Sequence, residues 1–485
     1  MTAPAAPPHP GRWAALFVIG LAQLMVVLDA TIVNIALPQA QAHLGISDAD
    51  RQWVVTAYTL AFGGLLLLGG RIADFWGRKR TFVVGALGFA VASALGGLAQ
   101  NGEMLFAARG LQGIFGALLA PAGLALLTVL FTDATERARA FSVFGAIAGG
   151  GSAVGLVLGG VLTEYADWRW CLLVNIPISV VAVVLALPFV PESRATGDTR
   201  YDIPGAVAVT VGLVALVYGF TRASEDGWSS RWALVSFGVA VVLLVAFVLI
   251  ERRSKHPLVP LGLLVDRNRG GAYLFSTLVG AGLLGAFLFL TFYFQVVLGY
   301  TPLQAGLASL PVTGGVLIAA GVASQLMPRI GPKPLMVTGG VVAAAGMVLL
   351  TRITVESGFV TLLLPAQLVL GLGLGLSFVP LASLALVGVG NQDAGAASAV
   401  LNATQQVGAS LGTALLNTIA TTAAASWIAA NPITDPSQML DAAVHSYVVA
   451  FAWAAALLAI GTALILILVR ANKQDLPTVP PAHVG

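Results

Sequence analysis

The feature that most constrains this chain is the recurrence of apolar runs about 20 residues long, the length that an α-helix needs to cross a bilayer. Only 9% of the 485 residues are charged, against about 25% in an average soluble domain. The sequence therefore predicts an all-α integral membrane protein with fourteen transmembrane helices. The expected spans are 13–36, 52–71, 81–99, 104–130, 141–162, 170–190, 204–221, 232–250, 271–296, 304–326, 335–352, 359–388, 396–423 and 446–470.

The distribution of lysine and arginine predicts how these helices are oriented. Positively charged loops stay on the cytoplasmic side. With both termini inside, the cytoplasmic segments hold 18 of the 24 Lys and Arg residues and the opposite loops hold five. The first run is longer than the core of a signal peptide, so we expect it to be retained. The chain is expected in the inner (cytoplasmic) cell membrane, with residues 1–12 as a cytoplasmic leader and 471–485 as a cytoplasmic tail.

Composition and motif searches narrow the classes of function. The net charge of +3 follows from the bias of the inner loops and does not indicate nucleic-acid binding. Cys171 is the only cysteine, which excludes an internal disulfide or a multi-cysteine metal cluster, and the histidines are too scattered for a metal site. No phosphate-binding loop, zinc-protease motif or nucleophile elbow occurs. We therefore expect no enzyme activity, cofactor or metal, and an ion gradient as the energy source unless a partner protein supplies ATPase activity.

Two short basic turns suggest an internal repeat. The segment Gly77-Arg78-Lys79 follows the second expected span, and Gly331-Pro332-Lys333 follows the tenth. Parallel repeats of six helices are an established transporter architecture. This spacing predicts six-helix bundles at 13–190 and 271–470, an inserted helix pair at 204–250, and a cytoplasmic linker at 251–270.

Two charged residues stand alone inside apolar spans. Asp29 lies deep in the first span, where a charge costs about 2.5 to 3.5 kcal/mol on insertion scales, and burial favours the neutral form of a carboxyl group. It is a candidate proton carrier, or else a helix-packing hydrogen-bond partner, because Gln23, Thr31 and Asn34 share a face from which Asp29 points away. Arg109 in the fourth span is a candidate fixed countercharge for it, or else a structural or snorkelling residue.

The loop between the second and third spans carries a dense charge cluster. Asp74, Gly77, Arg78 and Lys79 lie within six residues. Asp74 is expected to pair with an arginine and to cap the next helix, which would make this loop a conformational latch. The alternative is a simple basic turn of the cytoplasmic side, and the charge pattern alone does not separate the two.

Polar and aromatic residues within spans are candidates for lining a substrate cavity. Such walls suit bulky apolar or cationic ligands, although each aromatic side chain fits core packing equally well. Glycines one helical turn apart in the fifth span predict close helix packing, either static or at a sliding interface between the bundles. The expected cavity residues are Asn34, Gln112, Phe292, Tyr293, Gln295, Asn402, Gln405 and Gln406, and the helix-packing glycines are Gly151, Gly155 and Gly159.

Several of these segments together resemble the major facilitator superfamily, and specifically its fourteen-helix drug:proton antiporter branch. Residues 28–38 resemble the first-helix motif of that branch, 70–80 the superfamily loop motif, and 109–113 the fourth-helix motif whose arginine is implicated in proton transfer. Residues 168–170, 175–177 and 395–412 are similar to further sections. Two positions depart from the pattern: Phe75 replaces a common basic residue, and Leu156 replaces the proline of the fifth-helix antiporter motif.

The resemblance implies a multidrug exporter that works by alternating access between its two bundles. Asp29 and Arg109 would couple inward proton movement to export of an amphipathic drug or antibiotic. The expected partners are this small molecule, protons and the lipid bilayer, without nucleic acid, and a monomer is expected. Two alternatives remain open: a proton-coupled transporter of a specific metabolite, and a membrane sensor or scaffold that does not transport.

Overall fold

The computed structural model describes residues 11–131, 133–194, 202–254, 257–258, 261–387, 394–431, 435 and 437–471. Within these residues every regular element is a helix. Most of the expected leader and tail, and parts of the expected 251–270 linker, lie outside the described residues. The helices of the N-terminal part are α1 (Arg12–Leu44), α2 (Trp53–Trp76), α3 (Arg78–Gly97), α4 (Gly102–Leu130), α5 (Ala134–Tyr165), α6 (Trp170–Leu173) and α7 (Asn175–Phe189).

The remaining helices follow the same pattern of long rods, some of them interrupted. The two turns η1 and η2 are π-helical: η1 extends the end of one α-helix and η2 leads directly into another. These elements are α8 (Ile203–Asp226), α9 (Arg231–Arg253), α10 (Leu261–Val265), α11 (Arg267–Phe292), η1 (Tyr293–Val297), α12 (Pro302–Ala308), α13 (Leu310–Ile330), α14 (Pro332–Leu350), η2 (Phe359–Leu363), α15 (Leu364–Leu386), α16 (Ala394–Ala430) and α17 (Ser437–Leu468).

Thirteen helices in the described part of the chain are long and apolar enough to cross a membrane. The 37-residue helix α16 is not one of the thirteen. It contains no charged residue, but alanine, glycine, threonine, asparagine and glutamine take many of its positions. The structure thus has the expected all-helical membrane architecture, and α16 is the helix on which the count of fourteen depends.

Several helices extend beyond the apolar runs that predicted them, so the expected boundaries were too short. Helix α1 ends at Leu44 instead of residue 36, α5 begins at Ala134 instead of residue 141, and α17 begins at Ser437 instead of residue 446. A helix satisfies its backbone hydrogen bonds internally whether or not its side chains are apolar, so it continues until a residue stops it. Gly45, with a φ of +63°, stops α1.

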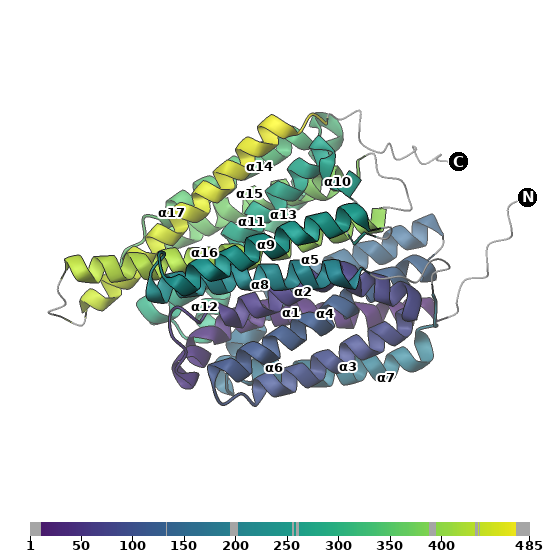
Figure 1. The fold of residues 1–485 in the computed structure, drawn as a ribbon, viewed down its shortest axis with the longest axis horizontal. Helices are drawn as coiled ribbons and strands as arrows, with labels where there is room; N and C mark the ends of the chain where they lie inside the picture. The colour runs from purple at the N-terminus through teal and green to yellow at the C-terminus, as the bar shows by residue number, and fades with distance from the viewer. Residues whose placement is uncertain are drawn as a thin grey trace, which may run out of the picture.

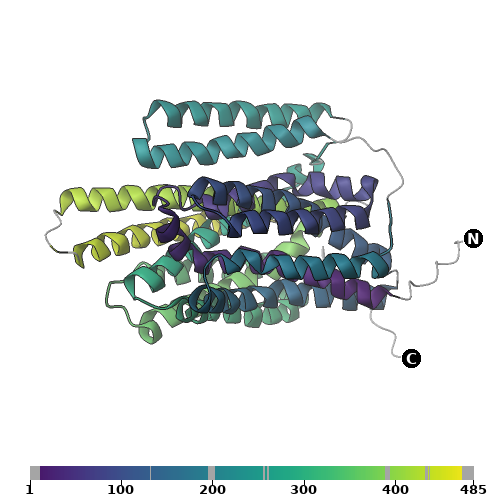
Figure 2. The same ribbon diagram turned by 90° about the horizontal axis from the view of Figure 1, so that it is seen from below.

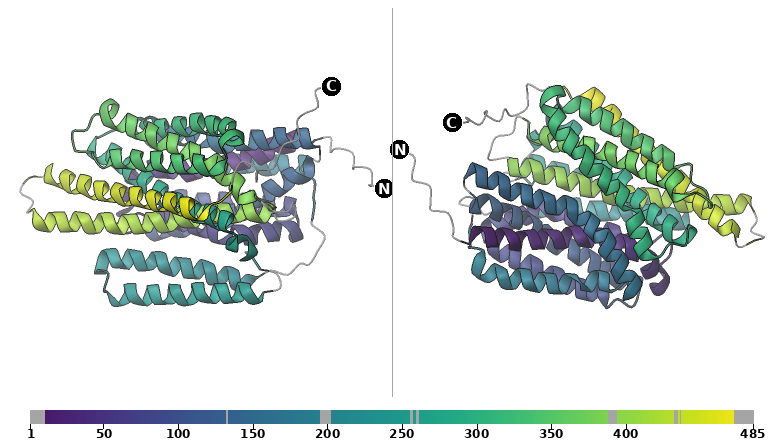
Figure 3. Two further views of the ribbon diagram at one scale, coloured as in Figure 1. Left: turned by 90° about the horizontal axis from the view of Figure 1, so that it is seen from above. Right: turned by 180° about the vertical axis from the view of Figure 1, so that it is seen from behind.

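The helices form two halves that lie side by side. Figure 1 shows the N-terminal helices α1–α7, purple to blue, packed along the C-terminal helices α11–α17, green to yellow. Figure 3 shows the same division from two other directions. Helix α1 begins and α17 ends at one end of the bundle, which we call the termini end. The turn around Gly77 lies at this end, and the turn between α1 and α2 lies at the opposite end.

Glycine contacts reveal that the two halves pack in the same way. A Cβ atom added at Gly113 of α4 would overlap the carbonyl oxygen of Tyr58 on α2. A Cβ atom added at Gly371 of α15 would overlap the carbonyl oxygen of Val312 on α13 in the same manner. Helices α2 and α13 are also the two that precede the basic glycine turns. The shared contacts therefore place α2 and α4 in register with α13 and α15.

Helices α8 and α9 form a separate layer beside the two halves (Figure 2). Helix α9 packs mainly on α8, and α8 touches both halves. Gln52 Nε2 of α2's N-terminal turn donates to Thr221 Oγ1 at 2.9 Å, and Thr418 Oγ1 of α16 donates to the carbonyl oxygen of Phe220 at 2.9 Å. The pair thus covers the line along which α2 meets α16.

Candidate functional site

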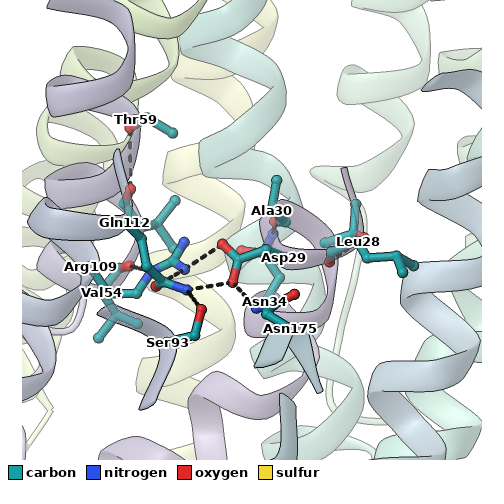
Figure 4. A network of polar contacts seen from close by, with 12 residues as sticks. Leu28, Asp29, Ala30, Asn34, Val54, Thr59, Ser93, Arg109, Gln112 and Asn175 are labelled. Atoms are coloured by element: carbon teal, nitrogen blue, oxygen red, sulfur yellow. Dashed lines mark hydrogen bonds and ion pairs between the residues drawn. The ribbon is translucent and has the colours of Figure 1, made fainter. Parts of the chain in front are cut away.

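Asp29 lies at the centre of a buried polar network inside the N-terminal half (Figure 4). Its side chain is completely buried. One carboxylate oxygen, Oδ2, accepts from the Arg109 guanidinium at 2.5 Å. The other, Oδ1, accepts from Gln112 Nε2 at 3.0 Å and from Asn175 Nδ2 at 2.9 Å. Both oxygens of this membrane-embedded carboxylate therefore have donors, from α4 and α7.

Arg109 is held just as closely. It is 1% exposed, and its Nε donates to the carbonyl oxygen of Val54 on α2 at 2.9 Å. The guanidinium carbon lies 4.5 Å from the centroid of the Tyr58 ring, in a cation–π contact. The same nitrogen that binds Asp29 also donates to Gln112 Oε1 at 2.7 Å. These contacts fix the position of the charge and leave the guanidinium little freedom to follow Asp29 if the carboxylate moves.

Close packing of α4 on α2 makes this geometry possible. Gly113 lies one turn after Arg109, and a side chain there would overlap the Tyr58 carbonyl oxygen. Without that side chain the two helix backbones approach closely, as small residues allow in lipid. The approach brings the Arg109 side chain within reach of both the Val54 carbonyl and the Tyr58 ring.

The charges of Asp29 and Arg109 compensate each other in a buried environment. An ion pair in a low-dielectric interior is strong, but taking both charges out of water is expensive. Protonation of Asp29 would cancel one charge and leave Arg109 with only neutral partners: Gln112, the Val54 carbonyl and the Tyr58 ring. The ion pair that links α1 to α4 therefore depends on the charge of Asp29.

The structure brings three of the predicted site residues together and leaves the others elsewhere. Asp29, Arg109 and Gln112 form the network. Asn34 lies outside it: its Nδ2 donates to the Ala30 carbonyl oxygen at 3.0 Å, and its buried Oδ1 has no partner among the described residues. This separation agrees with the expected angular offset between Asp29 and the face that carries Asn34.

The polar residues predicted on α16 lie in its first half, where Gln405 and Gln406 are level with the middle of α11 and α2. Asn402 is exposed, whereas Gln405 and Gln406 are partly buried, and none of them is bonded to Asp29 or Arg109. A Cβ atom added at Gly63 of α2 would lie 2.8 Å from Gln406 Cβ, so α16 packs directly on the N-terminal half here. Their role as cavity residues stays a prediction.

The aromatic residues predicted to line the cavity are packed in the described core. Phe292 is 4% exposed and Tyr293 is fully buried, with its hydroxyl group donating to the Thr354 carbonyl oxygen at 2.6 Å. Gln295 Nε2 donates to the Ile35 carbonyl oxygen at 2.8 Å and so joins the C-terminal half to α1. In this structure these three residues serve packing between helices, and contact with a substrate stays a prediction.

The basic loop after α2 is bound within the N-terminal half. Arg78 forms an ion pair of 2.8 Å with Asp74, and Lys79 Nζ donates to the Leu187 carbonyl oxygen at 2.6 Å. Gly77 has a φ of +125°, and an added Cβ would lie 2.7 Å from Glu192. The contacts described for these residues do not cross to the C-terminal half, and a latch function stays a prediction.

One expectation for this loop was wrong. Asp74 does not cap α3: the N-cap is Gly77, which makes no side-chain capping bond. The physical reason is that Asp74 still belongs to the last turn of α2, where its carboxylate is used by Arg78 one turn later. The expected pairing of Asp74 with an arginine is present.

The glycines of α5 face α1 and therefore pack within the N-terminal half. A Cβ atom at Gly155 would overlap Thr31 Oγ1, and one at Gly159 would lie 3.1 Å from the Ile32 Cα. Gly151 meets Leu24 and Val27 at 3.1–3.4 Å. The contact of α5 with the C-terminal half is made elsewhere on the helix, where an added Cβ at Gly160 would lie 2.6 Å from the Cα of Leu303.

Sequence analysis missed several members of the network. Asn175, Ser93 and Tyr58 were not proposed as site residues, although Ser93 Oγ accepts from Gln112 at 2.7 Å. Asn175 could have been found, because it is a polar residue within an apolar span. The role of the Val54 carbonyl could not, because every residue has a backbone carbonyl group. Among the described residues no group of three or more His, Cys, Asp and Glu side chains is placed to hold a metal ion.

In the C-terminal half the position that matches Arg109 holds Gln367, four residues before Gly371 as Arg109 is before Gly113. Gln367 is fully buried, and neither of its amide atoms has a hydrogen-bond partner among the described residues. The charged network is therefore a feature of one half, although both halves share the helix packing around it.

Comparison with known proteins places the chain in a family. The family model of the Major Facilitator Superfamily matches residues 19–413. The chain is 50% identical to the puromycin resistance protein pur8 of Streptomyces alboniger over 96% of this chain and 93% of that protein. It is 40% identical to a probable actinorhodin transporter of Streptomyces coelicolor over 86% and 74%. It is 38% identical to the cephamycin export protein CmcT of Amycolatopsis lactamdurans over 84% of each chain.

Solved structures agree on the fold. The model superimposes with a TM-score of 0.68 on a bacterial homologue of the human lysosomal transporter Spinster in an inward-facing, unoccupied conformation, covering 98% of this chain and all of that one at 14% identity. A peptide transporter in complex with sulfate matches with a TM-score of 0.65 at 14% identity, over 96% of each chain. The matched sequence family, the relatives and the shared helical architecture lead to one conclusion: this chain belongs to the major facilitator superfamily of membrane transporters.

Proposed function

We propose that this transporter exports amphipathic antibiotics or drugs across the cytoplasmic membrane in exchange for protons. Three relatives that share 38–50% identity with the chain are named for puromycin resistance, actinorhodin transport and cephamycin export. These compounds differ in chemistry but are all small molecules. The function further rests on the buried ionisable network, which a passive channel or a scaffold would not need.

The proposed topology has fourteen spans with both termini in the cytoplasm. Helix α16 would be the fourteenth span, because it is long enough and carries no charged residue. It packs between α11, α17 and α2, and four of its polar side chains are buried: Ser410, Thr413, Asn417 and Thr418. The proposed units are bundles 13–190 and 271–470, the inserted pair 204–250 and the linker 251–270. No feature of the described surface requires a second copy, and we propose a monomer.

The single observation that carries proton coupling is the set of contacts around Asp29. A buried carboxylate in a membrane segment is costly and is a functional-site candidate by default. Here it has a fixed countercharge, Arg109, and two neutral donors, Gln112 and Asn175. Since Arg109 keeps its proton, the variable element is Asp29.

The proposed cycle uses this difference between the two protonation states. With Asp29 ionised, the ion pair binds α1 to α4. Protonation from the outer side weakens that link and allows the two halves to rearrange, and release of the proton inside restores it. Each charge that moves down a potential of 100 mV supplies about 2.3 kcal/mol. The substrate would contact polar side chains in the first half of α16, of which Asn402, Gln405 and Gln406 are the candidates.

The test uses purified protein in vesicles with an acidic lumen and a trapped pH-sensitive dye. Puromycin added outside should accumulate in the vesicles while the lumen becomes more alkaline. Asp29→Asn should abolish both signals, because the side chain can no longer exchange a proton. Asp441→Asn, an exposed position on α17, is the matched control and should retain both.

Three outcomes would contradict the proposal in different ways. Wild-type rates of puromycin accumulation and proton efflux in Asp29→Asn would remove Asp29 from the mechanism. If the wild-type protein moves neither puromycin nor other amphipathic compounds such as ethidium, while a small polar metabolite is transported, export of drugs is wrong. Puromycin flux that leaves the lumen pH unchanged would retain export and reject proton exchange.

A further inference from the structure

The short turn between α1 and α2 places a second buried arginine in the structure, far along the chain from Arg109. Arg51 lies at the end of the bundle opposite the termini and is only 5% exposed. Its Nε donates to Asn417 Oδ1 of α16 at 3.0 Å. In return, Asn417 Nδ2 donates to the carbonyl oxygens of Asp48 and Ala49 at 2.8 and 3.2 Å. The turn of the N-terminal half and a helix of the C-terminal half therefore bind each other in both directions.

Aromatic rings of the C-terminal half complete the pocket around the guanidinium. Its central carbon lies 4.4 Å from the centroid of the Phe292 ring and 5.7 Å from that of Phe289, both on α11. Arg51 also interacts with Tyr447 of α17, which packs against Phe289 with ring centroids 5.7 Å apart. Cation–π contacts of this kind are stronger when water is excluded.

The ion pair that Arg51 makes inside its own half does not explain its burial. Asp48 lies 3.2 Å away, but its side chain is 70% exposed, whereas that of Arg51 is 6% exposed. An exposed partner of this kind contributes little. The remaining groups that compensate the buried charge, an amide and three aromatic rings, all come from the C-terminal half.

We propose that Arg51 is the outer gate residue of the transporter, a latch that closes the end opposite the termini. When the halves separate at this end, Arg51 must leave the aromatic pocket and enter water, and when they close it returns. The inference rests on the proposed alternating access between the halves. The proposal names Arg51 as the residue that keeps the outer side closed. The pocket that holds Arg51 is formed by Phe289, Phe292, Tyr447 and Asn417.

If Arg51 holds the outer end closed, its removal should change the populations of the outwardly closed and outwardly open states. Removing the guanidinium removes contacts that exist only in the outwardly closed state, so the equilibrium moves toward the outwardly open state. The ratio of open to closed molecules should rise about tenfold, which corresponds to 1.4 kcal/mol. Lysine at position 51 would keep the charge on the rings but cannot reproduce the planar contact with Asn417, so Arg51→Lys should fall between wild type and Arg51→Ala.

The experiment measures distances across the outer end in full-length protein. Spin labels are attached to cysteines introduced at Glu103, at the start of α4, and at Glu356, between α14 and η2, both of which are exposed. The native Cys171 is replaced by serine. Distance distributions are recorded by pulsed electron paramagnetic resonance in lipid nanodiscs, without substrate or gradient. Arg352→Ala is the control, because it removes an exposed arginine near the same end.

The expected result is a rise of about tenfold in the ratio of the longer-distance to the shorter-distance population in Arg51→Ala, and no change in Arg352→Ala. Asn417→Ala and Phe292→Leu, which keep Arg51 but alter its pocket, should shift the distribution in the same direction and carry the test if Arg51→Ala does not fold. Distributions identical to wild type in both pocket variants, and in Arg51→Ala where it folds, would overturn the proposal. Because the measurement needs no substrate, a failure of drug export in vesicles would remain a separate result.

Discussion

The buried pair of Asp29 and Arg109 makes a testable statement about stability. In Arg109→Ala the carboxylate keeps Gln112 and Asn175 as donors but loses its countercharge, and the Val54 carbonyl and Gln112 Oε1 each lose a donor. Breaking a buried ion pair by removing one partner costs about 3–5 kcal/mol. At about 2–4 °C per kcal/mol for a unit of this size, the apparent midpoint should fall by about 6–20 °C.

The companion variants show whether the charge is responsible. Asp29→Asn preserves the size of the side chain and an acceptor oxygen, so its cost should be smaller, about 1–3 kcal/mol. The double variant Asp29→Asn/Arg109→Ala has no carboxylate left without a countercharge. The double variant should therefore lose less stability than the sum of the two single changes.

The chain supplies its own reporter for this measurement. Cys171 is the only cysteine and is fully buried, so a thiol-reactive fluorophore will label it only when the N-terminal half unfolds. Detergent-purified variants are heated with the fluorophore and their labelling midpoints compared. The reasoning is refuted if Arg109→Ala unfolds within about 2 °C of wild type, less than about 1 kcal/mol, or if the two single costs simply add.

Three further changes have definite expected outcomes in the same assay. Gly113→Ala should lower the free energy of unfolding by about 1–3 kcal/mol, because the added methyl group meets the backbone of α2. Gly110→Ala on the same helix is the control, because its methyl group meets no atom within 4 Å. Equal midpoints for the two variants would contradict the close approach of α4 to α2. Gly77→Ala should lose about 1–2 kcal/mol at its φ of +125°, and an unchanged midpoint would show that the turn relaxes. Asn175→Ala removes a hydrogen bond to the Asp29 carboxylate and should lower the free energy of unfolding by about 1.5–3 kcal/mol at pH 8. An unchanged midpoint at that pH would be evidence against this hydrogen bond.

The fold was largely predictable because the bilayer imposes a simple requirement on the sequence. Long apolar runs cannot be accommodated otherwise, so an all-helical membrane fold follows directly. The ends of the helices were less predictable, since nothing in an apolar run marks where α1 ends or α17 begins outside it. Helix α16 shows a different difficulty: its alanine and polar residues lower its hydropathy, although neighbouring helices bury several of them, such as Thr413 and Asn417.

The site was predictable to the extent that isolated charges must find each other. Asp29 and Arg109 were the two lone charges in apolar spans, so their meeting follows from the cost of leaving either one unpaired. Their neutral partners depend on how α2, α3, α4 and α7 pack, and a single sequence does not encode which serine or carbonyl group lies opposite. The role proposed for Arg51 was not predictable either. In the sequence Arg51 is one charge in an outer loop, and its partners on α11, α16 and α17 are distant along the chain.

The matched packing of the two halves has a consequence for how such a protein can change over generations. Both halves share the close approach of two helices at a glycine, yet the described ion pair of Asp29 and Arg109 lies in the N-terminal half, and Gln367 stands at the position that matches Arg109 in the other half. A substitution in one half therefore need not be accompanied by a matching substitution in the other. The helix packing restricts both halves alike, whereas the contacts of the Asp29 carboxylate restrict only the N-terminal half.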